Sequence, residues 1–186
     1  MLKLKNRQQG FTIVELLIVI VVIGILAAIS IVAYNNVTAK ARDSQREQDI
    51  KTIAKALEMY YVDNGGFPPS NCGGLTGVLC PDPKKINTSW ATTSDGSWSR
   101  LESALVPKYI SALPKDPIAS TTTQAAISGG YNYDYVTTSA WCGVAYGQLY
   151  LLTYQLESSG RKTDLVGDCS GTAVTAYGSS RYIVVK

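Results

Sequence analysis

Gly10-Phe11-Thr12-Ile13-Val14-Glu15, followed by an apolar run that continues to about Ala33, is the stretch that decides the fold of this chain. No charged residue occurs from Leu16 to Ala39. An α-helix rises about 1.5 Å per residue, so a helix over residues 11–33 would be about 34 Å long, enough to cross a hydrocarbon core of about 30 Å. The stretch therefore predicts a membrane-spanning helix.

Glu15 is the one charged side chain within this apolar segment. A carboxylate at membrane depth is costly and usually marks a function that supplies it with a partner. The simpler interpretation is a plain anchor whose Glu15 lies near the lipid headgroups. The residues around Glu15 favour the functional interpretation.

Gly10-Phe11-Thr12-x-x-Glu15, after a short basic leader and before an unbroken apolar helix, resembles the prepilin signal of type IV pilins and type II secretion pseudopilins. The resemblance is specific over residues 1–70 and weak beyond them. It implies that a membrane-embedded prepilin peptidase removes residues 1–10 by cutting after Gly10. It also implies N-methylation of Phe11, a role for Glu15 in assembly, and an inner-membrane assembly platform as partner.

The leader contains Lys3, Lys5 and Arg7 and no acid, so the positive-inside rule places it in the cytoplasm and the rest of the chain outside. We expect a single-pass protein of the cytoplasmic membrane that later enters an extracellular or periplasmic filament. The alternative is an ordinary secretory signal cleaved near Ala27, Ala28 and Ser30. The length of the apolar run and the helical pattern beyond it argue against that alternative.

Residues 34–62 form an amphipathic pattern, in which Ile50, Ile53, Leu57 and Tyr61 recur on one helical stripe. With no proline before Val62, we predict one helix of about 50 residues, whose first half lies in the membrane and whose second half packs on a domain. Two helices hinged near residues 35–36 are the alternative. Asn64-Gly65-Gly66 provides the helix stop.

Residues 63–186 are expected to form a globular head with a loop, a short helix near residues 99–106 and an antiparallel sheet with one polar face. Strand patterns occur at residues 131–135, 148–156 and 181–185. The predicted fold class is α+β, a long N-terminal helix packed on a small antiparallel sheet, which is also the pilin "lollipop" that the resemblance implies.

Four cysteines behind a membrane-targeting segment indicate two disulfides in an oxidising compartment. Four cysteines allow three pairings, and we favour Cys72–Cys80 and Cys142–Cys169 because each pair closes the nearer loop. Free buried thiols are the alternative.

The composition argues against an enzyme and against a cofactor. The chain has no histidine, which removes the commonest general base and metal ligand. The acid pairs Asp134/Glu157 and Asp164/Asp168 raise calcium as an alternative, but Arg161 and Lys162 crowd the second pair and no alternating run of oxygen ligands is present.

Nucleic-acid binding is also disfavoured. Without the leader, 17 − 3 = 14 basic residues balance 14 acidic ones. Trp90 and Trp98, with Lys84, Lys85 and Arg100, could form an aromatic-basic patch for single strands, but tryptophans that cover a small core explain the same pattern better.

We therefore predict a structural subunit of a type IV pilus-like helical filament that self-associates after storage in the membrane. A pseudopilin of a type II secretion or competence system is the first alternative. A membrane-anchored extracytoplasmic binding module is the alternative from another class. Type IVa pilins commonly have a proline near the positions of residues 28–33, where this chain has none. Gly24 is then the remaining, weaker point at which the apolar helix could unwind locally.

Overall fold

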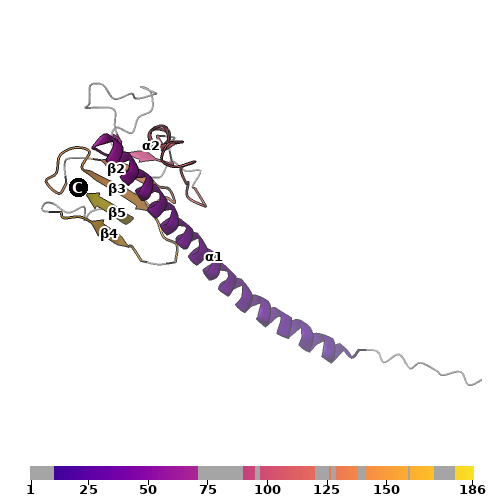
Figure 1. Cartoon of the computed structure of the whole chain (residues 1–186). Coiled ribbons are helices and arrows are strands. Elements are labelled where there is room, and N and C mark those ends of the chain that lie inside the picture. Colours follow the sequence, from indigo (N-terminus) through magenta and orange to yellow (C-terminus); the bar gives the residue numbers. More distant parts are fainter. Residues whose placement is uncertain are drawn as a thin grey trace, which may run out of the picture. The chain divides into compact units, whose positions relative to one another are not determined.

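A single long helix, α1 (Ile13–Asn64), runs through both compact units of the chain, residues 1–39 and residues 40–186 (Figure 1). The computed structural model describes residues 11–70, 90–94, 97–119, 126, 129–137, 141–158, 160–169 and 179–186. The helix continues without a break through Asn35 and Asn36. The single-helix prediction is therefore confirmed, and the alternative of two hinged helices is wrong.

In the first unit, the apolar side chains of α1 are exposed all around the helix. Ile18, Ile23 and Ile29 each keep more than half of their surface exposed. The hydroxyls of Ser30 and Thr38 are satisfied within the helix, since Ser30 Oγ donates to the Leu26 carbonyl and Thr38 Oγ1 to the Tyr34 carbonyl, both at 2.8 Å. Helical hydrogen bonding of this kind suits an apolar environment, because it satisfies polar groups without water.

In the second unit, α1 ends where the sequence predicts. Gly65 adopts a left-handed conformation with φ +71°, and its N–H donates to the Tyr61 carbonyl at 2.8 Å. Glycine accepts this conformation without the steric cost that a Cβ atom brings, which explains the helix stop.

The second unit also contains a five-stranded sheet with the order β1-β2-β3-β5-β4. Its strands are β1 (Ala91–Thr92), β2 (Asp134–Thr137), β3 (Leu149–Tyr154), β4 (Thr163–Val166) and β5 (Ser180–Val185). β2, β3 and β5 correspond to the three strands expected from the sequence, and β3 pairs with both of the others in antiparallel orientation. The expected antiparallel sheet needs one correction, because β4 pairs with β5 in parallel and makes the sheet mixed.

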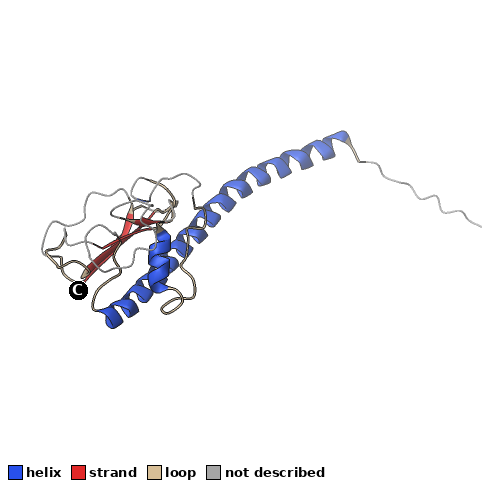
Figure 2. Cartoon of the chain, turned by 90° about the horizontal axis from the view of Figure 1, so that it is seen from above, coloured by secondary structure: helices blue, strands red, loops and turns tan. Residues whose placement is uncertain are grey.

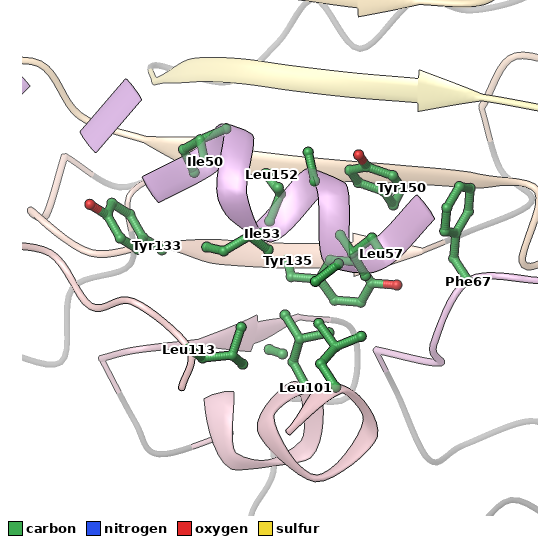
Figure 3. Close-up of a cluster of buried hydrophobic side chains, with 14 of the residues drawn as sticks. Ile50, Ile53, Leu57, Phe67, Leu101, Leu113, Tyr133, Tyr135, Tyr150 and Leu152 are labelled. Atoms are coloured by element: carbon green, nitrogen blue, oxygen red, sulfur yellow. The ribbon is translucent and has the colours of Figure 1, made fainter. Parts of the chain in front are cut away.

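The main core lies between the C-terminal half of α1 and one face of the sheet (Figures 1 and 2). Ile50, Ile53 and Leu57 of α1 meet Tyr135 and Leu152 of the sheet (Figure 3). Helix α2 (Trp98–Leu105) closes this core with Trp98, Leu101 and Leu105 and begins one residue before the expected start. Burial of these side chains supplies most of the driving force that holds α1 to the head.

The opposite face of the sheet is also covered, in contrast to the expected polar face. Val136, Leu149, Leu151, Ile183 and Val185 form a second hydrophobic cluster there. Trp90, Trp141 and the Cys142–Cys169 region complete this cluster. All residues of β2 and β3 are buried for this reason.

Candidate assembly site

The first turn of α1 has a reciprocal cap between Thr12 and Glu15. The Glu15 carboxylate accepts hydrogen bonds from the Thr12 backbone N–H at 2.8 Å and from the Thr12 hydroxyl at 2.7 Å. The Glu15 backbone N–H in turn donates to Thr12 Oγ1 at 3.2 Å. This is the capping-box arrangement, which satisfies N–H groups that a helix N-terminus otherwise leaves without partners.

The structure thus gives Glu15 a partner within its own chain, which the sequence analysis missed. The signal was present, because Thr12-x-x-Glu15 before an apolar run has the spacing of a capping box. Phe11 is 88% exposed at the start of the described segment, and Gly10 lies outside the described residues. Glu15 thus lies four residues after Phe11, the residue that the expected cleavage would expose.

Among the described residues, α1 is the one helix that is long and apolar enough to cross a membrane. Its most apolar 18-residue window has a mean hydropathy of 3.3 and is not buried by any part of the chain that the structure describes. Apolar surface of this extent is strongly unfavourable in water. It must be covered by lipid or by other protein chains.

A buried cluster of charges surrounds Arg46 at the start of the second unit. The Arg46 side chain is fully buried and donates to both Asp116 oxygens, from Nε to Oδ2 at 2.7 Å and from Nη2 to Oδ1 at 3.1 Å. Its Nη1 donates to Asp43 at 2.8 Å and to Glu157 at 2.7 Å. The guanidinium also lies 4.9 Å from the centre of the Tyr131 ring. Arg46 thereby joins α1 to two segments that are distant in the sequence.

Two carboxylates of this cluster, those of Asp43 and Glu157, are held in their charged forms. Arg42 donates to both Glu157 oxygens at 2.8 and 2.5 Å, and this contact, supported by Arg46 against the effect of burial, lowers the pKa of Glu157. Burial alone would raise the pKa of Asp43. Hydrogen bonds from Ser158, from the Glu157 backbone and from Arg46 outweigh burial and lower it. The cluster is therefore a set of satisfied ion pairs and fastens the head to α1.

The two acid pairs that suggested a calcium site lie in different surroundings. Glu157 belongs to the arginine cluster, whereas Asp134 is buried in β2 and accepts a hydrogen bond from Thr153. Asp164 and Asp168 are exposed on and after β4. In the part of the chain that the structure describes, no group of three or more metal-ligating side chains comes together.

The two tryptophans of the suggested nucleic-acid patch pack in the core, and two of the cysteines form a disulfide. Trp98 is 2% exposed and Trp90 is 9% exposed, so both cover the core, as the packing interpretation expects. Lys84 and Lys85 lie outside the described residues. The predicted disulfide Cys142–Cys169 is confirmed, whereas Cys72 and Cys80 lie outside the described residues.

Two family models match the chain. The model described as prokaryotic N-terminal methylation motif matches residues 5–31. The model described as type II secretion system (T2SS), protein G, matches residues 33–160. The first match covers the candidate assembly site, and the second covers the rest of α1 and most of the head.

Curated proteins show the same two kinds of similarity. The type II secretion system core protein G of Pseudomonas aeruginosa is 32% identical over 113 residues, which are 61% of this chain and 70% of that protein. The protein of the same description in Escherichia coli K12 is 35% identical, over 60% of this chain and 68% of its own length. A type IV major pilin of Neisseria gonorrhoeae is 40% identical over 72 residues, 39% of this chain and 34% of the pilin. No solved structure matches significantly.

Proposed function

This chain belongs to the type II secretion system protein G family, and on that premise we propose that it is a structural subunit of a type IV pilus-like helical filament. The observation that carries the proposal is α1 itself. One unbroken helix of 52 residues has an exposed apolar part and a part packed on a folded head. Lipid covers the apolar part before assembly, and the helices of other copies cover it in the filament.

Glu15 is the proposed determinant of how copies are arranged. After cleavage behind Gly10, the chain would begin with the cationic amine of Phe11. In an isolated copy, Thr12 satisfies the Glu15 carboxylate locally. In the filament, the amine of an incoming copy would take that carboxylate as its partner, because an unpaired buried charge is strongly unfavourable. The pair would set the axial stagger, much as one buried polar residue sets register in a coiled coil.

The position of the similarity along the chain supports one type of filament over the other. The protein G model covers most of the head, whereas the match to the pilin covers 72 residues. A type II secretion pseudopilus is therefore the filament that the head supports better, with a surface pilus as the second candidate.

Processing and topology complete the proposal. The methylation-motif match over residues 5–31 supports cleavage after Gly10 by a prepilin peptidase and methylation of Phe11. The basic leader supports a cytoplasmic N-terminus and a head outside the cytoplasmic membrane. An inner-membrane assembly platform is the further partner that this family of filaments implies.

The test compares Glu15→Ala with Thr12→Val. Under the proposal, the Glu15→Ala subunit is inserted, cleaved and stable in the membrane fraction but yields few or no sheared fibres. Thr12→Val removes the hydroxyl of the cap and keeps the carboxylate, so its fibre yield should stay well above that of Glu15→Ala. Mass spectrometry of the mature N-terminus checks cleavage in each strain.

Three outcomes would count against the proposal. Equal losses in both variants would mean that Glu15 serves only to cap the helix. Normal fibres from Glu15→Ala, with stable subunits, would exclude Glu15 as the determinant of assembly, whereas a wild-type chain that forms no fibres would favour the membrane-anchored binding module.

A further inference from the structure

Two segments of the second unit expose apolar side chains side by side. Among the described residues of this unit, six large apolar side chains have an exposed fraction of 36% or more. Four of the six fall in two short segments, one in α1 and one in β4, and neighbouring exposed apolar side chains are typical of contact surfaces. The four are Met59, Val62, Leu165 and Val166, and the other two are Ile118 and Tyr146.

The surface on α1 is basic as well as apolar. Lys51, Lys55, Met59 and Val62 follow one another at spacings of four, four and three residues, so they lie on one face of the helix, here called the basic stripe. All four residues are exposed. Neither lysine has an ion-pair partner within the described residues.

The acids of α1 near the basic stripe are already occupied. The ion pairs that occupy three of them are Glu47–Lys162, Glu58–Lys186 and Asp63–Lys108. Asp49 lies on another side of α1, where its carboxylate accepts a hydrogen bond from the buried Tyr133 at 2.8 Å. The charge that the stripe offers to another molecule is therefore positive.

The surface at β4 is apolar and acidic. The strand lies at one end of the sheet, and all four of its residues are exposed (Figure 1). Asp164, Leu165, Val166 and Asp168 are here called the acidic edge. Neither of the two carboxylates has an ion pair in the part of the chain that the structure describes. The exposed Arg161 lies three residues before Asp164, outside this segment.

The other end of the described sheet is closed. Both residues of β1 are buried. The Ser97 hydroxyl accepts a hydrogen bond from the Thr92 backbone N–H at 2.8 Å and donates one to the Trp90 carbonyl at 3.3 Å. Native sheets protect their edges in such ways. Of the two ends of the described sheet, the one at β4 is therefore open to another chain.

We infer that the basic stripe of one copy packs on the acidic edge of the next copy in the filament. The inference rests on the proposed function and names the surfaces through which the heads meet. The two surfaces have opposite charges and both carry apolar side chains. Both stay exposed within one chain, so neither covers the other. A contact between two different surfaces of identical chains repeats from copy to copy, and it generates an open helical array when the rotation does not close a ring.

Cysteine cross-linking tests the contact directly. One copy carries Val62→Cys, and a second copy with a different tag carries Val166→Cys. The two copies are expressed together, and sheared fibres are treated with a short bifunctional maleimide. We expect a linked dimer that carries both tags. The matched control replaces Val62→Cys by Ile118→Cys, an exposed apolar position outside both surfaces, and should give at least about fivefold less linked dimer.

Charge reversal tests the contact by rescue. An exposed ion pair contributes up to about fivefold to an association constant. Lys51→Glu/Lys55→Glu and Asp164→Lys/Asp168→Lys should each lower the fibre yield at least about fivefold, because attraction becomes repulsion. The chain with all four reversals should regain most of the yield. Near-ultraviolet circular dichroism of each variant verifies that the head is folded.

Fibres that form normally but contain no linked dimer would overturn the inference and leave the proposed filament standing. Equal linking by the Ile118→Cys control would overturn it too, because the linked positions would then be close only by chance. So would fibre losses that the four reversals together fail to restore. A wild-type chain that forms no fibres would refute the proposed function, and the contact between heads with it.

Discussion

Arg46 and Asp116 lie 70 residues apart in the sequence and form a two-pronged ion pair in which both side chains are fully buried. The pair fastens the middle of α1 to the loop that follows α2. Nη1 of Arg46 donates to both Asp43 and Glu157. Because Glu157 follows β3, the same guanidinium also holds that segment. The attachment of the head to α1 therefore has an electrostatic component beside its hydrophobic one.

Replacement of Arg46 by methionine should destabilise the head by about 3–5 kcal/mol, because it leaves two buried carboxylates without their cation. That is a large part of the roughly 5–15 kcal/mol available to a domain. The double variant Arg46→Met/Asp116→Leu should recover part of the loss. Chemical denaturation of the full chain in detergent, followed by near-ultraviolet circular dichroism, measures both.

Arg42→Met is the control for this series. Arg42 is 29% exposed and Glu157 would keep Arg46 as a partner, so the cost should be about 1 kcal/mol or less. Equal destabilisation by Arg42→Met and Arg46→Met would show that burial of Arg46 has no special importance.

Lowering the pH should destabilise the folded head. The folded state lowers the pKa of Asp43 and of Glu157 below their ordinary values of 3.8 and 4.5. A group with a lowered folded pKa stabilises above its unfolded pKa and loses that contribution as the pH falls through the folded value. Burial raises the pKa of Asp49 despite its hydrogen bond from Tyr133, so Asp49 acts in the opposite direction.

The unfolding midpoint of the full chain in detergent should therefore fall as the pH drops below about 4.5. Asp43→Asn should be less stable at pH 7 and should lose less on acidification. A variant whose midpoint depends on pH as steeply as that of the wild type would exclude Asp43 as a contributor.

The Cys142–Cys169 disulfide should contribute about 3–4 kcal/mol, because it closes a loop with a sequence separation of 27. Cys142→Ser/Cys169→Ser should lower the denaturation midpoint accordingly. Cys72→Ser/Cys80→Ser, which would open a shorter loop, should cost less. Non-reducing peptide mapping of the wild-type chain tests the pairing, and a bridge between Cys72 and either of the other two residues would contradict it.

Gly167 should tolerate no side chain. Its φ is +94°, and a Cβ atom would lie 2.2 Å from the Val185 carbonyl oxygen. Gly167→Ala should therefore destabilise the β4–β5 edge by roughly 1–3 kcal/mol. Gly160→Ala, where a Cβ atom meets nothing within 4 Å, should change the stability by about 0.5 kcal/mol or less. Comparable effects of the two substitutions on the unfolding midpoint would contradict this account.

Where hydrophobic periodicity carries the information, the structure agrees with the sequence. The uninterrupted helix, its end at Gly65 and the three antiparallel strands all follow from local patterns. The parallel strand β4 was not expected, because its four residues are all exposed and show no buried face. The covered second face of the sheet was also missed, since the residues that cover it come from irregular segments without periodicity.

The sequence by itself determined the apolar span, the position of Glu15 in it and the capping spacing to Thr12, because each of these depends only on residues in one contiguous stretch of the chain. Tertiary structure alone decided which distant carboxylates Arg46 and Arg42 neutralise. Local patterns cannot show this. Asp116 and Glu157 lie 70 to 115 residues from these arginines, and only the tertiary packing of the head brings them within hydrogen-bonding distance.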